Sequence, residues 1–147
     1  MKASAIFLAA AAFLAAALPV AATAQEDARY NAVLSRLQSM GCGYYTDAEW
    51  AEIDREVAAL SDDAAARNDG PAIVRAALVK AMVDNDMRNR HAAAAATLHQ
   101  AIRQVDAIPG TDASPLYVKL AEVMSDAGDA AGVETAIREY KIGRAHV

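Results

Sequence analysis

The residues best suited to bind a metal ion lie close together in one short segment of the sequence. Asp86, Met87 and His91 are the candidate ligands, with Asp84 just before them and His99 further along. Thioether and imidazole groups suit copper, and imidazole with carboxylate suits zinc. If a helix begins near residue 88, Met87 and His91 share one of its faces, whereas His99 lies too far around the axis to join them. The alternative is structural: Asp84 and Asp86 cap that helix, and the histidines lie on a solvated surface.

A second reactive group is the single cysteine, Cys42, which lies between two glycines. Three interpretations stay open: a reactive free thiol, an intermolecular disulfide, or a small half-buried residue in a connector. An internal disulfide is excluded because the sequence has no second cysteine. No nucleophile motif, glycine-rich phosphate loop or calcium loop is present. We therefore predict that the protein is not an enzyme and needs no cofactor.

The N-terminal residues have the composition of a secretory signal peptide. Lys2 supplies the positive charge, and residues 6–18 form an apolar run of about 13 residues, which is short for a membrane span. Small residues follow, and the predicted cleavage site lies between Ala24 and Gln25. Abundant Ala and Arg with scarce Lys are typical of GC-rich bacteria. We therefore expect removal of residues 1–24 and export to the periplasm of a Gram-negative bacterium, or secretion, with no stable membrane insertion.

The overall charge limits the classes of partner. The chain has 19 acidic and 14 basic residues, a net charge of −5, and loss of Lys2 with the signal peptide makes it −6. An acidic chain without basic runs is a poor partner for nucleic acid or for an anionic membrane surface. Few aromatic residues and abundant alanine indicate one all-α domain, over residues 25–140.

Apolar residues recur every three or four positions in six segments, which predicts six helices. The first three predicted helices are residues 26–40, ended by Gly41; residues 46–67, opened by a Thr46–Glu49 capping box; and residues 71–82, opened by Pro71. The fourth is residues 88–105, ended by Ile108-Pro109-Gly110. The fifth is opened by Ser114 as N-cap and by Pro115, and the sixth runs through Val133 to Tyr140. Short connections between them predict three sequential antiparallel hairpins. Leu78, Leu98, Leu120 and Ile137 are expected in the core.

The last two predicted hairpins show an internal similarity, because Pro71 to Ala77 aligns with Pro115 to Ala121. The residues that carry a family resemblance are Tyr117, Leu120, Ala121 and Met124, the Gly128-Asp129 turn, and Val133, Ile137 and Tyr140. This stretch resembles one tetratricopeptide repeat, which implies stacked helical hairpins whose concave face binds peptides or helices. It departs from that family at Ala121, where Gly is usual, and at Val133, where a small residue is usual. The preceding unit also exceeds the usual length of about 34 residues. An ordinary six-helix bundle is the alternative.

The C-terminal segment, residues 141–147, differs from the rest. One codon solution for its sequence, KIGRAHV, matches the adapter commonly ligated to DNA for short-read sequencing. We therefore expect the natural sequence to end at Tyr140 and the tail to be foreign, so that Arg144 and His146 belong to no site. Whether the natural chain continues past Tyr140 stays open.

Together these patterns favour an exported, non-catalytic helical module that binds or scaffolds a protein or peptide partner. Its acidic surface suits polar or basic partners. The alternative function is a small periplasmic protein that handles copper or zinc through Asp86, Met87 and His91.

Overall fold

The computed structural model describes residues 27–40 and 43–145. The chain divides into two compact units, residues 1–45 and 46–147. In the first unit residues 27–40 form a helix, in agreement with the prediction for residues 26–40. The predicted signal peptide, its cleavage site at Ala24 and Gln25, and Cys42 lie outside the described residues.

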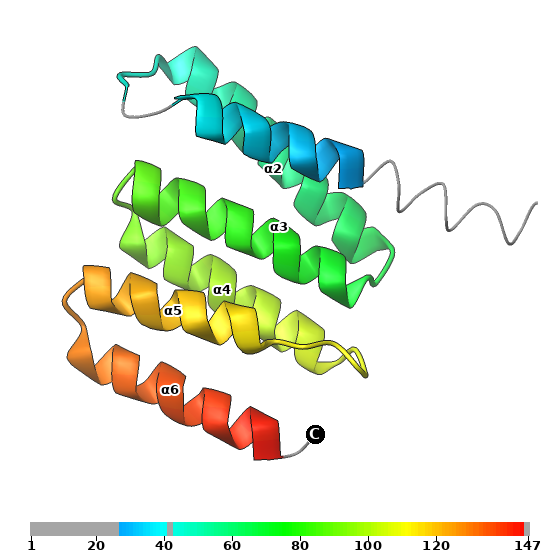
Figure 1. The fold of residues 1–147 in the computed structure, drawn as a ribbon, viewed down its shortest axis with the longest axis vertical. Coiled ribbons are helices and arrows are strands. Elements are labelled where there is room, and N and C mark those ends of the chain that lie inside the picture. Colours follow the sequence, from blue (N-terminus) through cyan, green and yellow to red (C-terminus); the bar gives the residue numbers. More distant parts are fainter. Residues whose placement is uncertain (1–26, 41–42, 146–147) are drawn as a thin grey trace, which may run out of the picture. The chain divides into compact units, whose positions relative to one another are not determined.

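The second unit is a sequential stack of helices. Its elements are α2 (Asp47–Ala66), α3 (Gly70–Met82), the π-helical turn η1 (Val83–Met87), α4 (His91–Asp106), α5 (Ser114–Asp126) and α6 (Ala130–Ala145). Each element contacts the next along the chain, and α3 also contacts α5. Figure 1 shows α3 with α4, and α5 with α6, as antiparallel pairs joined by short connections. With residues 27–40, the described part of the chain has six α-helices and no strand, which confirms the all-α class.

Side chains cap two of the helices, and the sequence predicts the first of these caps. At the start of α2, the Thr46 hydroxyl accepts from the Glu49 amide at 3.3 Å, and the Glu49 carboxylate accepts from the Thr46 amide at 2.7 Å. These two bonds form the predicted capping box. At the start of α3, the Asp69 carboxylate accepts from the Ala72 amide at 3.0 Å. Both caps satisfy amides that a helix start leaves without an intrahelical acceptor.

Two helix starts differ from the prediction. Ser114 is the first residue of α5 and not its cap, and its amide donates to the Asp112 carboxylate at 2.9 Å. The fourth helix begins at His91 instead of Arg88. The reason is the connection before it, where η1 is followed by Asn89 in the left-handed region with φ of 51°. Continuous α-helix cannot pass through that backbone conformation.

The core of the second unit is rich in alanine, which lets helices approach closely. The members of its main cluster are Ala64, Ala72, Ile73, Val74, Ala77, Ala81, Ala94, Ala95, Leu98, Ala101, Ile102, Val105, Leu116, Leu120, Val123 and Ala136. Six of its members come from α4 and recur there at three- and four-residue spacing, which confirms the helical period predicted for this segment. Within residues 27–40 and 43–145, no helix combines the length and the apolar character needed to cross a membrane.

The four residues predicted as core differ in burial. Leu98 and Leu120 are buried, and Leu78 is partly buried against the cluster. The prediction for Ile137 is wrong, because 44% of this residue is exposed. Its neighbour Ala136 is buried instead. Helix α6 also continues past Tyr140 to Ala145, so the first residues of the predicted foreign tail are helical.

Candidate functional site

A cluster of polar side chains surrounds the η1 turn between α3 and α4. Asp84 and Asn85 lie at its centre and are the buried polar residues among those described, with 1% and 2% exposure. Burying polar groups is costly unless they are hydrogen-bonded. Short π-helical segments frequently occur at functional sites. The cluster is therefore the first candidate functional site.

Two cations hold the Asp84 carboxylate. One oxygen accepts from Lys80 Nζ at 2.9 Å, and the other accepts from Arg90 Nε at 3.0 Å and also from Arg90 Nη2. Burial raises the pKa of Asp84, but the hydrogen bonds and charges of Arg90 and Lys80 outweigh it, so the pKa falls below its ordinary value of 3.8. The carboxylate is therefore ionised at neutral pH.

This ion pair overturns the predicted capping role of Asp84 and Asp86. The N-cap residue of α4 is Arg90, and no side chain caps it. Asp84 meets Arg90 in another way, because its backbone oxygen accepts from the Arg90 amide at 2.7 Å. The aspartates are thus engaged by cations and not by free amides of the first turn of α4.

The Asn85 side chain joins α4 to α5. Its Nδ2 donates to Asp126 Oδ2 at 2.6 Å and to Asp86 Oδ1 at 2.7 Å. Its Oδ1 lies 2.7 Å from His91 Nδ1, so in this orientation Nδ1 carries the proton and donates. A single buried amide therefore links the start of α4 to the end of α5.

Three exposed carboxylates meet beside that amide. Oxygens of Asp86, Glu122 and Asp126 lie within 4.8 Å of one another, close enough to share a cation. Lys119 Nζ already lies 2.9 and 3.0 Å from the two Asp86 oxygens and 2.7 Å from Glu122. Burial lowers the pKa of Lys119, but bonds to Glu122 and Asp86 raise it more, and the net pKa is above 10.5. A protonated lysine thus provides the positive charge among these carboxylates.

The predicted metal ligands have other contacts in the structure. Asp86 binds Lys119 and Asn85, and His91 contacts Asn85. Met87 ends the η1 turn and is half-buried. The left-handed backbone conformation of Asn89 interrupts the helix between Met87 and His91. The assumption that Met87 and His91 share one helix face is therefore wrong. Sequence reasoning did not anticipate Glu122 and Asp126, which come from a different helix.

One more cation ties this region to α2. Arg88 Nη1 lies 2.9 Å from Asp54 Oδ1, and the guanidinium lies 4.6 Å from the centre of the Trp50 ring. A cation over a tryptophan face is attracted by the ring's electron density. Residues of the η1 connection therefore contact α2, α3, α4 and α5 through polar groups.

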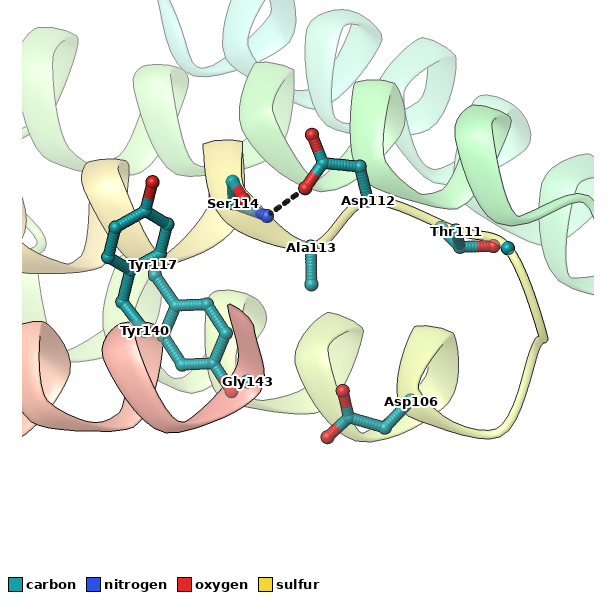
Figure 2. Close-up of a pocket in the computed structure, with 9 residues that line it drawn as sticks. Asp106, Thr111, Asp112, Ala113, Ser114, Tyr117, Tyr140 and Gly143 are labelled. Atoms are coloured by element: carbon teal, nitrogen blue, oxygen red, sulfur yellow. Dashed lines mark hydrogen bonds between the residues drawn. The ribbon is translucent and has the colours of Figure 1, made fainter. Parts of the chain in front are cut away.

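The second candidate is a pocket of about 520 Å³ at the other end of α5. Its lining residues are Asp106, Gly110, Thr111, Asp112, Ala113, Ser114, Tyr117, Tyr140 and Gly143. They come from the end of α4, the loop before α5, the first turn of α5 and the C-terminal half of α6. Figure 2 shows the two tyrosine rings on one side of the space, with Asp106 and the Asp112 loop on the others. The ring centres are 6.4 Å apart and the planes are inclined at 57°.

Acidic residues dominate the charge around this pocket. Burial raises the pKa of Tyr117 above 10.0, and the negative charges of Asp106 and Glu139 raise it further. Tyr117 therefore keeps its proton at neutral pH. The loop that carries Asp112 packs closely on the start of α3, where a Cβ on Gly70 would lie 1.9 Å from Thr111 Oγ1. The absence of a side chain at Gly70 thus allows the loop that carries Thr111 and Asp112 to pack against the start of α3.

No pattern in the sequence indicates this pocket. The sequence pattern places Tyr117 and Tyr140 in a repeat-like stretch, and Asp106 and Asp112 belong to no motif. Comparisons of the chain with protein-family models, with curated proteins and with solved structures found no match. Function therefore has to be inferred from the two sites and from the fold that holds them.

Proposed function

We propose that the protein is an exported, non-catalytic helical module that binds a protein or peptide partner. The observation that carries this proposal is the sequential packing of the second unit, in which α3 contacts both α4 and α5. Stacked helical hairpins pack in this neighbour-to-neighbour way and present extended surfaces that bind peptides or helices. The same packing supports the resemblance of residues 117–140 to a tetratricopeptide repeat.

The polar cluster at η1 supports a structural role. Asp84 is held by Lys80 and Arg90, and Asp86 is held by Lys119. Charges that are paired in this way fix the connection between helices, whereas a general acid or base needs a pKa near the working pH. The pKa of Asp84 is lowered below 3.8, so this carboxylate is poorly suited to act as a general acid or base near neutral pH.

A small metal-handling protein is the second candidate function. It is favoured by the three carboxylates of Asp86, Glu122 and Asp126, which lie within 4.8 Å of one another near His91. Oxygen ligands with an added imidazole suit zinc. A metal ion at this place would have to displace the Lys119 ammonium from Asp86 and Glu122. That competition makes metal handling the weaker proposal.

Selection from a random peptide library on the immobilised protein tests the module. We expect enrichment of related sequences, and we expect a synthetic peptide of that sequence to bind with a measurable Kd by calorimetry. The double variant Met87→Ala, His91→Ala should bind the peptide equally well. Failure to enrich any sequence would contradict the module.

A metal titration separates the two candidates. Copper and zinc are added in turn to the metal-free protein, and bound metal is measured after dialysis. One equivalent bound by the wild type and lost in Met87→Ala, His91→Ala, with unchanged circular dichroism, would favour metal handling. Export is tested by the intact mass of protein recovered from the periplasm, which should lack residues 1–24.

A further inference from the structure

The pocket between α4, α5 and α6 has the size and the charge of a cation site. Its volume of about 520 Å³ falls within the range of ligand pockets, about 300–1,000 Å³. The nine lining residues include two aspartates and no lysine, arginine or histidine. Glu139 adds a further negative charge close to Tyr117. A lining of this kind favours a positively charged group.

Two aromatic rings form one wall of the pocket. Tyr117 and Tyr140 are both half-buried, so part of each ring is accessible from the pocket side (Figure 2). A cation within about 6 Å of a tyrosine ring centre is attracted by the ring face. The carboxylate of Asp106 stands across the space from the rings. Asp112 contributes charge, while its Oδ1 accepts from the Ser114 amide.

We propose that this pocket binds the guanidinium group of an arginine side chain supplied by the partner, in contact with the Tyr117 and Tyr140 rings and paired with Asp106. The inference rests on the proposed function, because the partner supplies the arginine. Arginine suits the pocket better than lysine, since its planar group both stacks on aromatic rings and pairs with a carboxylate through two N–H groups. The net negative charge of the chain also attracts basic partners over a distance.

The chemistry of the pocket comes from residues 106–140. Gly143 is the lining residue that belongs to the predicted foreign tail, and it contributes no side chain. Asp106 is exposed at the end of α4, so its replacement leaves the core unchanged. Tyr117 packs partly against the core, so replacing its ring with an aliphatic group would also disturb folding. Asp106→Asn therefore tests the pocket without disturbing the core. Tyr117→Phe keeps the aromatic ring and removes only the hydroxyl.

The test is a titration of the purified, isotope-labelled protein followed by two-dimensional NMR. The probe is N-acetyl-arginine amide, and the matched neutral probe is N-acetyl-citrulline amide. We expect saturable shifts of amide signals at residues 106–117 and 140 with the arginine probe, and weaker binding of the citrulline probe. Asp106→Asn should weaken arginine binding about two- to fivefold, and added salt should weaken it further. Tyr117→Phe should bind as the wild type does.

A control and a peptide experiment complete the design. Glu134→Gln removes one negative charge from an exposed position of α6 outside the pocket and should leave the affinity unchanged. Equal binding of both probes, or equal binding by Asp106→Asn, would overturn the inference. If the library yields peptides that bind the wild type and Asp106→Asn with equal affinity, the proposed arginine site is wrong, whereas the proposed binding module is supported. If the library yields none, the module fails, and the pocket inference that rests on it fails with it.

Discussion

Asp84 is the residue on which the connection between α3 and α4 depends. Its side chain is 1% exposed, whereas those of its partners Lys80 and Arg90 are 41% and 44% exposed. The two cations therefore reach inward to a carboxylate that is fixed in the core. Removing one partner of a buried ion pair is costly, because the penalty of burying the carboxylate is offset only while its cations are present.

Replacing Asp84 by alanine should destabilise the protein by about 3 kcal/mol, the lower end for breaking a buried pair, since both cations can turn to solvent. Urea unfolding followed by circular dichroism measures the free energy of unfolding. The matched control is Asp54→Ala, which removes the surface pair with Arg88 and should cost less than about 1 kcal/mol. Equal losses in the two variants would contradict the assigned role of Asp84.

The lowered pKa of Asp84 also gives the protein a defined response to acid. A carboxyl whose folded pKa lies below its unfolded value stabilises the fold above the unfolded pKa, here 3.8, and that stability is lost as the pH falls toward the folded pKa. The difference in unfolding free energy between the wild type and Asp84→Asn should therefore be largest at neutral pH. It should narrow below about pH 4. A difference that stays constant from pH 7 to pH 3 would show that Asp84 is not ionised in the fold.

At the scale of elements, the sequence predicts the helices well and the connections poorly. Apolar residues in α4 recur every three or four positions in the sequence, and six residues of this helix are buried in the core cluster. The burial of Asp84 was not predictable in the same way, because Arg90 reaches it across a turn with π-helical geometry. The pocket was missed for a related reason. Asp106, Tyr117 and Tyr140 come from three helices, and no local pattern connects them.

Three side chains, one each from α4, α5 and α6, provide a test of the corrected core. Leu98→Ala and Leu120→Ala should each destabilise by about 2–5 kcal/mol, because both side chains are fully buried. Ile137→Ala should cost less than about 1 kcal/mol, because much of this side chain already contacts water. Thermal and urea unfolding of the three variants measures these costs. A loss for Ile137→Ala as large as that for Leu120→Ala would place Ile137 in the core after all.

At the scale of the whole molecule, the last residues of α6 contribute little to the fold. Lys141, Ile142 and Gly143 are exposed. Deleting residues 141–147 should therefore change the Tm by less than about 4 °C, the shift that a surface change produces in a domain of this size. Differential scanning calorimetry of the two chains gives the comparison. A much larger fall in Tm would mean that the segment is an integral part of the folded unit.

The order in which helices pack in the second unit has a consequence for how it forms. Most of its helix contacts join neighbours along the chain, so each contact closes only a short loop and loses little chain entropy. Domains dominated by such local contacts fold within microseconds to milliseconds. Helix α6 has one main neighbour, α5, whereas α3 packs against α2, α4 and α5. Amide hydrogens of α6 should therefore exchange with solvent sooner than those of α3, through openings that leave the rest of the unit intact.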